Sequence, residues 1–368
     1  MLPDLSTQDN ERYARQIILP EVGVEGQKRL KAAKVLIVGL GGLGSPAALY
    51  LAAAGIGVLG LMDADKVSLS NLQRQVIFRT EEIGLDKVDA AARHLKNLNP
   101  GVEIKAHREM ISADNALRIF ADYDVILDGT DNFATHYLIN DAAVLADKPL
   151  VWANVEKFAG QLGVIMPRQG PCYRCIYPSP PPPDVAPSCA EIGVLGVVPG
   201  IAGVLQATEV LKIILQIGQS LSGRVLRMDS LNASFKEIKI LRNPHCAVCG
   251  DHPVITHLTV TPDQNCTTVA EITADELQQL LKSGAAPFLL DVRNADEFSA
   301  GQIQTAHLIP LPVLAERLGE IPTDREIIVY CHSGRRSARA SQLLREKGYQ
   351  ARQLKGGILA MQIAGHCV

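Results

Sequence analysis

The stretch from Lys34 to Pro46, KVLIVGLGGLGSP, constrains the fold more than any other part of this sequence. It begins with an apolar run and continues with Gly39, Gly41 and Gly44 in G-x-G-x-x-G spacing. This pattern is typical of a buried parallel strand, a tight turn and the start of a helix. Glycine lets the backbone approach a phosphate, and the helix N-terminus offers free N–H groups. Asp63 ends the next apolar run, at the distance where an acid reaches a ribose hydroxyl. The stretch therefore predicts a nucleotide site, with a chance glycine turn as the alternative.

The sequence from residue 34 to about 154 alternates between strand-like and helix-like segments. This alternation predicts a Rossmann-like, doubly wound, mostly parallel α/β sheet that binds its ligand at the carboxyl ends of the strands. Strands are expected at Val35–Gly39, Val58–Asp63, Glu103–His107, Val125–Asp128 and Leu150–Asn154, and helices near Ala47–Ala54, Asp86–Leu98, Ala113–Phe120 and Phe133–Ala146. Further strand-like runs at Gly160–Met166, Arg224–Asp229 and Phe235–Ile240 indicate a second region of sheet.

A second, smaller α/β domain is expected at 269–368, after a first domain at 1–250. The intervening residues, 251–268, are rich in turn formers and show no periodicity, which is typical of a linker. A proline run at 180–183 predicts an irregular crossover inside the first domain. In the second domain, strands are expected at Phe288–Asp291 and Ile327–Tyr330, and helices at Asp275–Leu281, Val313–Leu318 and Arg336–Lys347.

Charge and hydropathy exclude several classes of protein. The net charge is -3 and 20% of the residues are charged, so the sequence has no basic surplus for binding nucleic acid. The polar N-terminus lacks the apolar core of a signal peptide, which favours a cytoplasmic protein. Residues Ile192–Leu205 carry no charged side chain, but they are shorter than a bilayer span and contain Pro199. We therefore expect a buried segment there and no membrane span.

Polar side chains follow several predicted strands of the first domain. The run from Ser70 to Gln75 contains Arg74, Lys87 begins a predicted helix, and Asp131 follows the fourth strand. Arginine and lysine suit phosphate oxygens and aspartate suits Mg²⁺, so the set fits a Mg-ATP site. A nicotinamide site would not need so many cations. Each residue alone could equally be a solvated surface charge.

Several motifs in the chain resemble those of one enzyme family: ERYARQ at 11–16, GLGGLGSP at 39–46, DADKVSLSNLQRQ at 63–75, GTDN at 129–132 and CYRCIYP at 172–178. With these motifs the chain resembles the ubiquitin-activating-like adenylyltransferases that serve sulfur carriers of molybdenum cofactor and thiamine biosynthesis. More specifically, it resembles the form that is fused to a C-terminal rhodanese domain, and the resemblance covers nearly the full chain.

The resemblance implies roles for individual residues. Asp131 would hold the Mg²⁺, and Arg15 would reach across a homodimer interface to the ATP phosphates. Without the resemblance, Arg15 would be read as a solvated helix charge. The implied ATP-binding residues are Gly41, Gly42, Asp63, Ser70, Asn71, Leu72, Gln73, Arg74, Lys87, Asp131 and Asn132.

The cysteines fall into two C-x-x-C pairs and four single residues. Cys172 and Cys175 form one pair, and Cys246 and Cys249 form the other, with 70 residues between them. Four thiolates in tetrahedral geometry bind a structural Zn²⁺, which the resemblance also implies, whereas one pair alone could be a redox dithiol. By resemblance, Cys189 occupies the position of the catalytic cysteine of ubiquitin-activating enzymes. The alternative for Cys189 is a buried cysteine with no chemical role.

A second loop that carries chemistry begins at Cys331, where an apolar strand ends and a helix begins. Backbone N–H groups, the helix N-terminus and the arginines Arg335 and Arg336 all favour a thiolate there. A thiolate can accept sulfur and carry it as a persulfide. Four residues separate Cys331 from Arg336. Related phosphatases have five, so the loop resembles that of a rhodanese.

Three positions depart from the usual rhodanese pattern. Gln302 stands where relatives commonly have histidine, Gln304–Thr305 replace Pro-Gly, and Met361 stands where tryptophan often follows the Gly356–Gly357 motif. These departures leave the preferred sulfur donor and full activity open, and they leave the fold unaffected.

Together these features predict a two-step enzyme. ATP would adenylate the C-terminal glycine of a small ubiquitin-like carrier ending in Gly-Gly, and a persulfide on Cys331 would convert the product to a thiocarboxylate. A cysteine desulfurase is a candidate sulfur donor. Two other classes stay open. A nicotinamide-dependent oxidoreductase would share the glycine turn, and a non-catalytic scaffold would bind the carrier without adenylating it.

Overall fold

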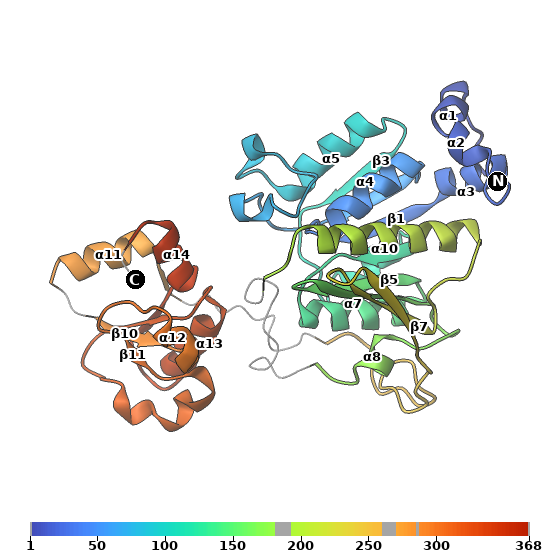
Figure 1. Ribbon diagram of the computed structural model, residues 1–368. Coiled ribbons are helices and arrows are strands. Elements are labelled where there is room, and N and C mark those ends of the chain that lie inside the picture. Colours follow the sequence, from blue (N-terminus) through green and yellow to red (C-terminus); the bar gives the residue numbers. More distant parts are fainter. Residues whose placement is uncertain (1, 181–192, 260–269, 285–286, 367–368) are drawn as a thin grey trace. The chain divides into compact units, whose positions relative to one another are not determined.

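The computed structural model describes residues 2–180, 193–259, 270–284 and 287–366 (Figure 1). The described chain divides into two compact units. The first takes residues up to 180 and from 193 to 259, and the second takes those from 270 onward. Cys189 lies outside the described residues.

The first unit is built on an eight-stranded sheet with strand order β3-β2-β1-β4-β5-β6-β7-β8. The strands β1 to β5 are parallel, and β6 to β8 continue the sheet in antiparallel fashion. The order reverses between β1 and β4, where doubly wound sheets bind their ligands. The predicted Rossmann-like fold is confirmed. The strands are β1 Lys34–Val38, β2 Val58–Met62, β3 Glu103–His107, β4 Val125–Asp128, β5 Leu150–Glu156, β6 Ala159–Ile165, β7 Arg224–Asp229 and β8 Ser234–Lys239.

Helices cover both faces of this sheet (Figure 1). Successive residues of β1 face opposite sides, so Val35 and Ile37 pack in one hydrophobic core while Leu36 and Val38 pack in the other. The first core includes α3 Gly23–Ala32, α4 Gly44–Ala54, α5 Lys87–Leu98 and α10 Val197–Leu215; the second includes α6 Ala116–Phe120, α7 Phe133–Leu145 and α8 Tyr173–Ile176. Two short helices, α1 Thr7–Arg12 and α2 Ala14–Ile17, precede them.

Helix α10 contains the C-terminal part of the apolar stretch that the sequence analysis considered. It is the one helix of the described chain that is long and apolar enough to cross a membrane. It nevertheless packs against α4, β5 and β6. It also buries Gln206 and Glu209, two polar side chains that bond inside the protein. Its place in the fold is that of a core helix.

The second unit holds a five-stranded parallel sheet with order β11-β10-β12-β13-β9. Its strands are β9 Glu271–Ile272, β10 Phe288–Asp291, β11 His307–Leu308, β12 Ile327–Tyr330 and β13 Ala351–Leu354, and its helices are α11 Ala274–Lys282, α12 Ala295–Ser299, α13 Arg335–Glu346 and α14 Gly357–Ile363. The helix expected at Val313–Leu318 is present as two 3₁₀ segments, Leu311–Glu316 and Leu318–Glu320, and not as an α-helix.

The first residues of the expected linker pack on the first unit. The Ile255 N–H donates to the Ala247 carbonyl over 2.9 Å. Ile255 and Leu258 pack against the same core as α7 and α8. The described chain up to 259 therefore extends the first unit beyond residue 250.

Candidate functional site

The glycine turn brings the ends of β1 and β4 into backbone contact. Gly39 has φ +89°, and a Cβ at Gly44 would lie 1.9 Å from the Gly39 carbonyl oxygen. A Cβ at Gly129 would lie 2.7 Å from the same oxygen. At Gly41, by contrast, the nearest atom to an added Cβ would be 3.8 Å away. There is thus open space beside Gly41 near the N-terminus of α4, where a phosphate would find free N–H groups.

Asp63 and Lys87 meet next to this turn, as predicted for a nucleotide site. The carboxylate of Asp63 accepts hydrogen bonds from the N–H groups of Leu40 and Asp65, each over 2.8 Å. Lys87 is the first residue of α5, and its Nζ lies 2.8 Å from Asp65 and 3.8 Å from Asp63. Burial raises the pKa of Asp63, and the charge of Lys87 opposes this rise. The ammonium group, nearly buried, is held between two carboxylates.

The predicted nucleotide segment 70–74 lies over the glycine turn. The Arg74 guanidinium donates to the Ser70 carbonyl over 3.0 Å, and the Arg74 stem would lie 3.4 Å from a Cβ added at Gly42. The Gln73 backbone packs against Gly196, just before α10. Leu72 packs against the hydrophobic core and anchors the segment. The structure therefore brings Arg74 next to the glycine turn, and Asn71 lies in the 3₁₀ turn Leu69–Asn71 that precedes it.

The last residue of β4 and one residue after it hold the local structure, and a third residue is exposed. Asp128 is 1% exposed; its carboxylate bonds to Thr130 and lies 2.6 Å from His136 Nδ1. Asn132 caps α7 by accepting from the Thr135 N–H over 2.9 Å. Asp131 lies between them and is exposed, so its carboxylate is accessible to a cation. The sequence analysis did not identify His136.

Arg15 lies away from the glycine turn within one chain. Its neighbour Tyr13 packs on Gly55, at the C-terminal end of α4. The turn is at the other end of this helix, about 16 Å away at 1.5 Å per residue. Arg15 is exposed, as are Ile18 and Leu19 nearby. A single chain therefore does not bring Arg15 to the nucleotide site.

The four cysteines of the two C-x-x-C pairs converge. Their sulfurs all lie within 4.8 Å of one another, with 3.5 Å between Cys172 and Cys246 and 3.4 Å between Cys175 and Cys249. A tetrahedral zinc ion with bonds of about 2.3 Å would set its sulfurs about 3.8 Å apart. The tetrad fits such an ion in ligand type, number and spacing.

Helix α8, which follows Cys172 and contains Cys175, is fixed to α7 by polar contacts. Arg174 donates two hydrogen bonds of 2.7 Å to Asp141, and its guanidinium lies 4.8 Å from the centre of the Tyr137 ring. The Tyr173 N–H donates to Asn140 Oδ1 over 2.8 Å. These contacts fasten α8, and with it Cys175, to α7.

In the second unit, the Cys331 loop curls around its sulfur atom. Cys331 is fully buried, and its Sγ accepts from the Gly334 N–H over 3.2 Å and lies 3.6 Å from Ser337 Oγ. The start of α14 is bonded to the loop, since the Ile358 N–H donates to the Cys331 carbonyl. Gly357 is required there, because a Cβ would lie 2.4 Å from that carbonyl oxygen.

Two arginines of this unit, Arg336 and Arg293, pair with acidic side chains. Arg336 donates to both oxygens of Glu297, over 2.6 and 2.7 Å, and these bonds lower the pKa of Glu297. Arg293 forms a buried pair with Asp291 and also donates to the Gly301 carbonyl. The sequence analysis did not identify Glu297, whose partner is 39 positions away.

The three departures from the rhodanese pattern have different structural consequences. Gln302 is exposed. Thr305 adopts φ +68°, a left-handed conformation that β-branched residues rarely take. Met361 is fully buried and packs in one of the two hydrophobic cores of this unit. The first two lie at the surface, and the third fills the interior.

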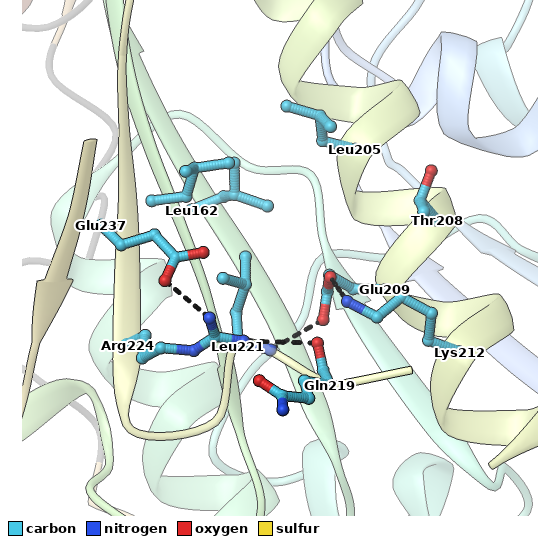
Figure 2. Close-up of a pocket in the computed structure, with 10 residues that line it drawn as sticks. Leu162, Leu205, Thr208, Glu209, Lys212, Gln219, Leu221, Arg224 and Glu237 are labelled. Carbon is cyan, nitrogen blue, oxygen red and sulfur yellow. Dashed lines mark hydrogen bonds and ion pairs between the residues drawn. The ribbon is translucent and has the colours of Figure 1, made fainter. Parts of the chain in front are cut away.

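A cavity of about 290 Å³ lies elsewhere in the first unit, beside the C-terminal half of α10 (Figure 2). Its charged side chains pair with one another: Arg224 bonds to Glu237, and Lys212 bonds to Glu209. Figure 2 shows leucine side chains between the two pairs. Because each charge already has a partner, the cavity offers no evident anion or metal site.

Comparisons with known proteins agree with this geometry. Residues 13–248 match the ThiF family. The chain belongs to this family. Residues 273–364 match the Rhodanese-like domain. The chain is 43% identical to the probable adenylyltransferase/sulfurtransferase MoeZ of Mycobacterium tuberculosis, over 97% of this chain and 93% of that protein. It is 50% identical to the sulfur carrier protein adenylyltransferase of Thermus thermophilus, over 66% of this chain and 92% of that protein.

The solved structures also show the fold of the first unit. The crystal structure of E. coli MccB with MccA-N7isoASN has a TM-score of 0.58 and is 25% identical, over 67% of this chain and 75% of that chain. The predicted family, the rhodanese domain and the two activities, adenylyl transfer and sulfur transfer, are confirmed. The chain is a member of an ATP-using adenylyltransferase family with an additional sulfurtransferase domain.

Proposed function

We propose that this cytoplasmic enzyme uses Mg-ATP to adenylate the C-terminal glycine of a small ubiquitin-like sulfur carrier and then converts it to a thiocarboxylate. The observation that carries the proposal is that one chain contains both sites. The first is a glycine turn with open space for an anion and with Lys87 beside it. The second is a buried Cys331 whose Sγ accepts a hydrogen bond from a backbone N–H. The Thermus thermophilus relative is named for acting on a sulfur carrier protein.

In the first step, the carrier carboxylate attacks the α-phosphate of ATP, and pyrophosphate leaves. Lys87, Arg74 and the N–H groups at the start of α4 offset the developing charge, while Asp63 accepts from a ribose hydroxyl. Asp131 is exposed at the same edge and would hold Mg²⁺, which neutralises phosphate charge when bound. Asn132 positions this aspartate by capping α7.

In the second step, a persulfide on Cys331 attacks the acyl carbon, and AMP leaves. The product is an acyl disulfide between the carrier and Cys331. A second thiolate, for which Cys189 is the candidate, then attacks Cys331 Sγ and releases the carrier thiocarboxylate. The resulting disulfide is reduced by an external thiol, and a cysteine desulfurase is the candidate that reloads Cys331 with sulfur.

The cysteine tetrad would hold a structural Zn²⁺. Four thiolates close the coordination sphere, so the metal would stabilise the fold and leave no position for a substrate. Its role would be to fasten residues 172–175 to residues 246–249 beside α7.

ATP–pyrophosphate exchange tests the proposal. Exchange should require a carrier with its terminal glycine, and Cys331→Ala should retain exchange while abolishing thiocarboxylate formation, measured by mass spectrometry. Thiocarboxylate formation by Cys331→Ala would refute the coupling. No exchange with any carrier would favour a scaffold, and quenching of NADH fluorescence would favour a dehydrogenase.

The proposed homodimer can be tested by complementation. Arg15→Ala and Lys87→Met should each be strongly impaired alone, by about 10-fold or more, if Arg15 serves the partner's site. Mixed in equal amounts and allowed to exchange subunits, they should recover about one quarter of the wild-type sites, because half the dimers then carry one intact site. Absence of recovery despite subunit exchange would show that Arg15 acts within its own chain or not at all.

A further inference from the structure

We propose that Gln75 is a further nucleotide-binding residue, whose side-chain amide donates a hydrogen bond to a phosphate oxygen of ATP. The proposal rests on the adenylation site described above. It adds to that site a residue just beyond the implied binding segment 70–74.

The first observation is that Gln75 is buried without satisfying its polar atoms. The residue is only 3% exposed, and its Oε1 is shielded from solvent with no hydrogen-bond partner among the described residues. Its Nε2, the donor that a phosphate oxygen requires, bonds to no described residue either. A buried polar atom without a partner costs stability, whereas an apolar side chain of the same shape would not. Packing alone therefore does not explain a glutamine at this position.

The second observation is where the amide lies. Its Nε2 is 3.9 Å from the position that a Cβ would occupy at Gly41, and the Gly129 carbonyl oxygen is the other near neighbour at 3.8 Å. Gln75 Nε2 thus borders the open space beside the glycine turn. Its own segment, 70–75, contains no acidic side chain that would repel an anion there.

The position of Gln75 is set by its backbone and its neighbours. Its N–H donates to the Asn71 carbonyl over 2.9 Å, and its own carbonyl accepts from the Phe78 N–H over 3.2 Å. Ile77 and Phe78 are buried in the core, which fixes the segment that follows. The amide is therefore held in place before a ligand arrives, and such preorganisation lowers the entropic cost of binding.

The chemistry of the surroundings indicates the ligand group. The space beside Gly41 lies near the N-terminus of α4, and Arg74 precedes Gln75 in the chain. Helix N-termini and cations attract anions, and a neutral N–H donor adds a directional contact to an anionic oxygen. A phosphate oxygen meets these conditions, whereas adenine and ribose carry no charge.

The test compares Gln75→Met with Gln27→Met in the full-length chain. Gln27 is also fully buried in this unit, but it accepts from Gln16 and donates to the Ala54 carbonyl. Gln75→Met should bind ATP about 10- to 100-fold more weakly, the usual loss for a hydrogen bond to a charged group, while adenosine binding stays unchanged. Gln27→Met should lower the unfolding temperature and keep ATP affinity.

Thermal unfolding separates a binding role from a structural one. Without nucleotide, Gln75→Met should unfold at or above the wild-type temperature, and the stabilisation by ATP should be reduced. Gln75→Glu, a second variant of similar shape, should bind ATP more weakly still, because its charge repels phosphate. Wild-type ATP affinity in both variants would overturn the proposal, as would equal losses of ATP and adenosine affinity. Such a result would leave pyrophosphate exchange by the wild-type enzyme, and hence the proposed function, intact.

Discussion

Replacing Lys87 with methionine should impair adenylation in two separable ways. The Lys87 side chain is 5% exposed, and its Nζ lies 3.8 Å from Asp63 and 2.8 Å from Asp65 beside the glycine turn. Loss of one charged hydrogen bond to a phosphate costs about 1.5–3 kcal/mol, so kcat/KM for ATP should fall by about 10- to 100-fold. The variant also removes the positive charge that opposes the burial-driven rise in the pKa of Asp63.

The second effect should appear in the pH profile. In the proposed site Asp63 would accept from ribose as a carboxylate, so activity should fall as the pH decreases through its pKa. Burial raises this pKa and Lys87 lowers it, so without Lys87 the pKa rises further. The acid limb of the ATP–pyrophosphate exchange profile should therefore move to higher pH in Lys87→Met.

Lys66→Met is the matched control. Lys66 pairs with Asp86 over 3.0 Å, but its side chain is 66% exposed. Exposed pairs contribute little, so this variant should keep both its kcat/KM for ATP and its acid limb. An unchanged acid limb in Lys87→Met would contradict the assigned coupling to Asp63. An unchanged kcat/KM would remove Lys87 from the phosphate site.

Three further predictions concern stability. Cys246→Ser should lose bound metal, measured by elemental analysis, and should unfold at a lower temperature. The reason is that a structural zinc contributes on the order of 10 kcal/mol to folding. A metal-free variant with wild-type stability would contradict the zinc assignment. Asp141→Asn should lower the free energy of unfolding by about 3 kcal/mol in denaturant titrations, because it leaves Arg174 charged and without its carboxylate, and a loss below about 1 kcal/mol would contradict this. Thr305→Gly should raise the unfolding temperature of the second unit, because relief of the φ +68° conformation is worth about 1 kcal/mol; a fall would show that the conformation is unstrained.

Strands β1, β2 and β4 of the parallel sheet could be predicted because each is a short apolar run that ends in, or is followed by, a glycine or an aspartate. Burial on both faces gives β1 its run from Val35 to Val38. The direction of β6 to β8 has no such signal, since a strand's residue pattern does not tell which way it runs. Strand β13, Ala351–Leu354, was missed because Arg352 and Gln353 interrupt the apolar pattern that would reveal it.

In the candidate site, local motifs identified which residues come together, but not the contacts that these residues make with distant parts of the chain. The C-x-x-C spacing and the glycine turn identified residues that the structure does bring together. The structural tasks of the site residues could not be read from the sequence. Arg336 was expected to favour a thiolate, yet it also pairs with Glu297 on α12. Leu72 anchors its segment in the core. These contacts join residues that are distant in sequence, so no local pattern reveals them.

The burial of Cys331 bears on why sulfur would be transferred as a persulfide. Its Sγ is fully shielded and accepts from the Gly334 N–H, so this atom cannot itself meet the acyl group of a carrier protein. A persulfide moves the reacting sulfur one bond, about 2.05 Å, farther from the loop. The outer sulfur can then attack the acyl-adenylate. The later attack of a second thiolate on Cys331 Sγ requires the loop around this atom to open, and until then the inner sulfur is shielded from unrelated thiols that would release the outer sulfur as hydrosulfide. Burial of Cys331 is therefore compatible with its proposed role, provided that the outer sulfur is the nucleophile.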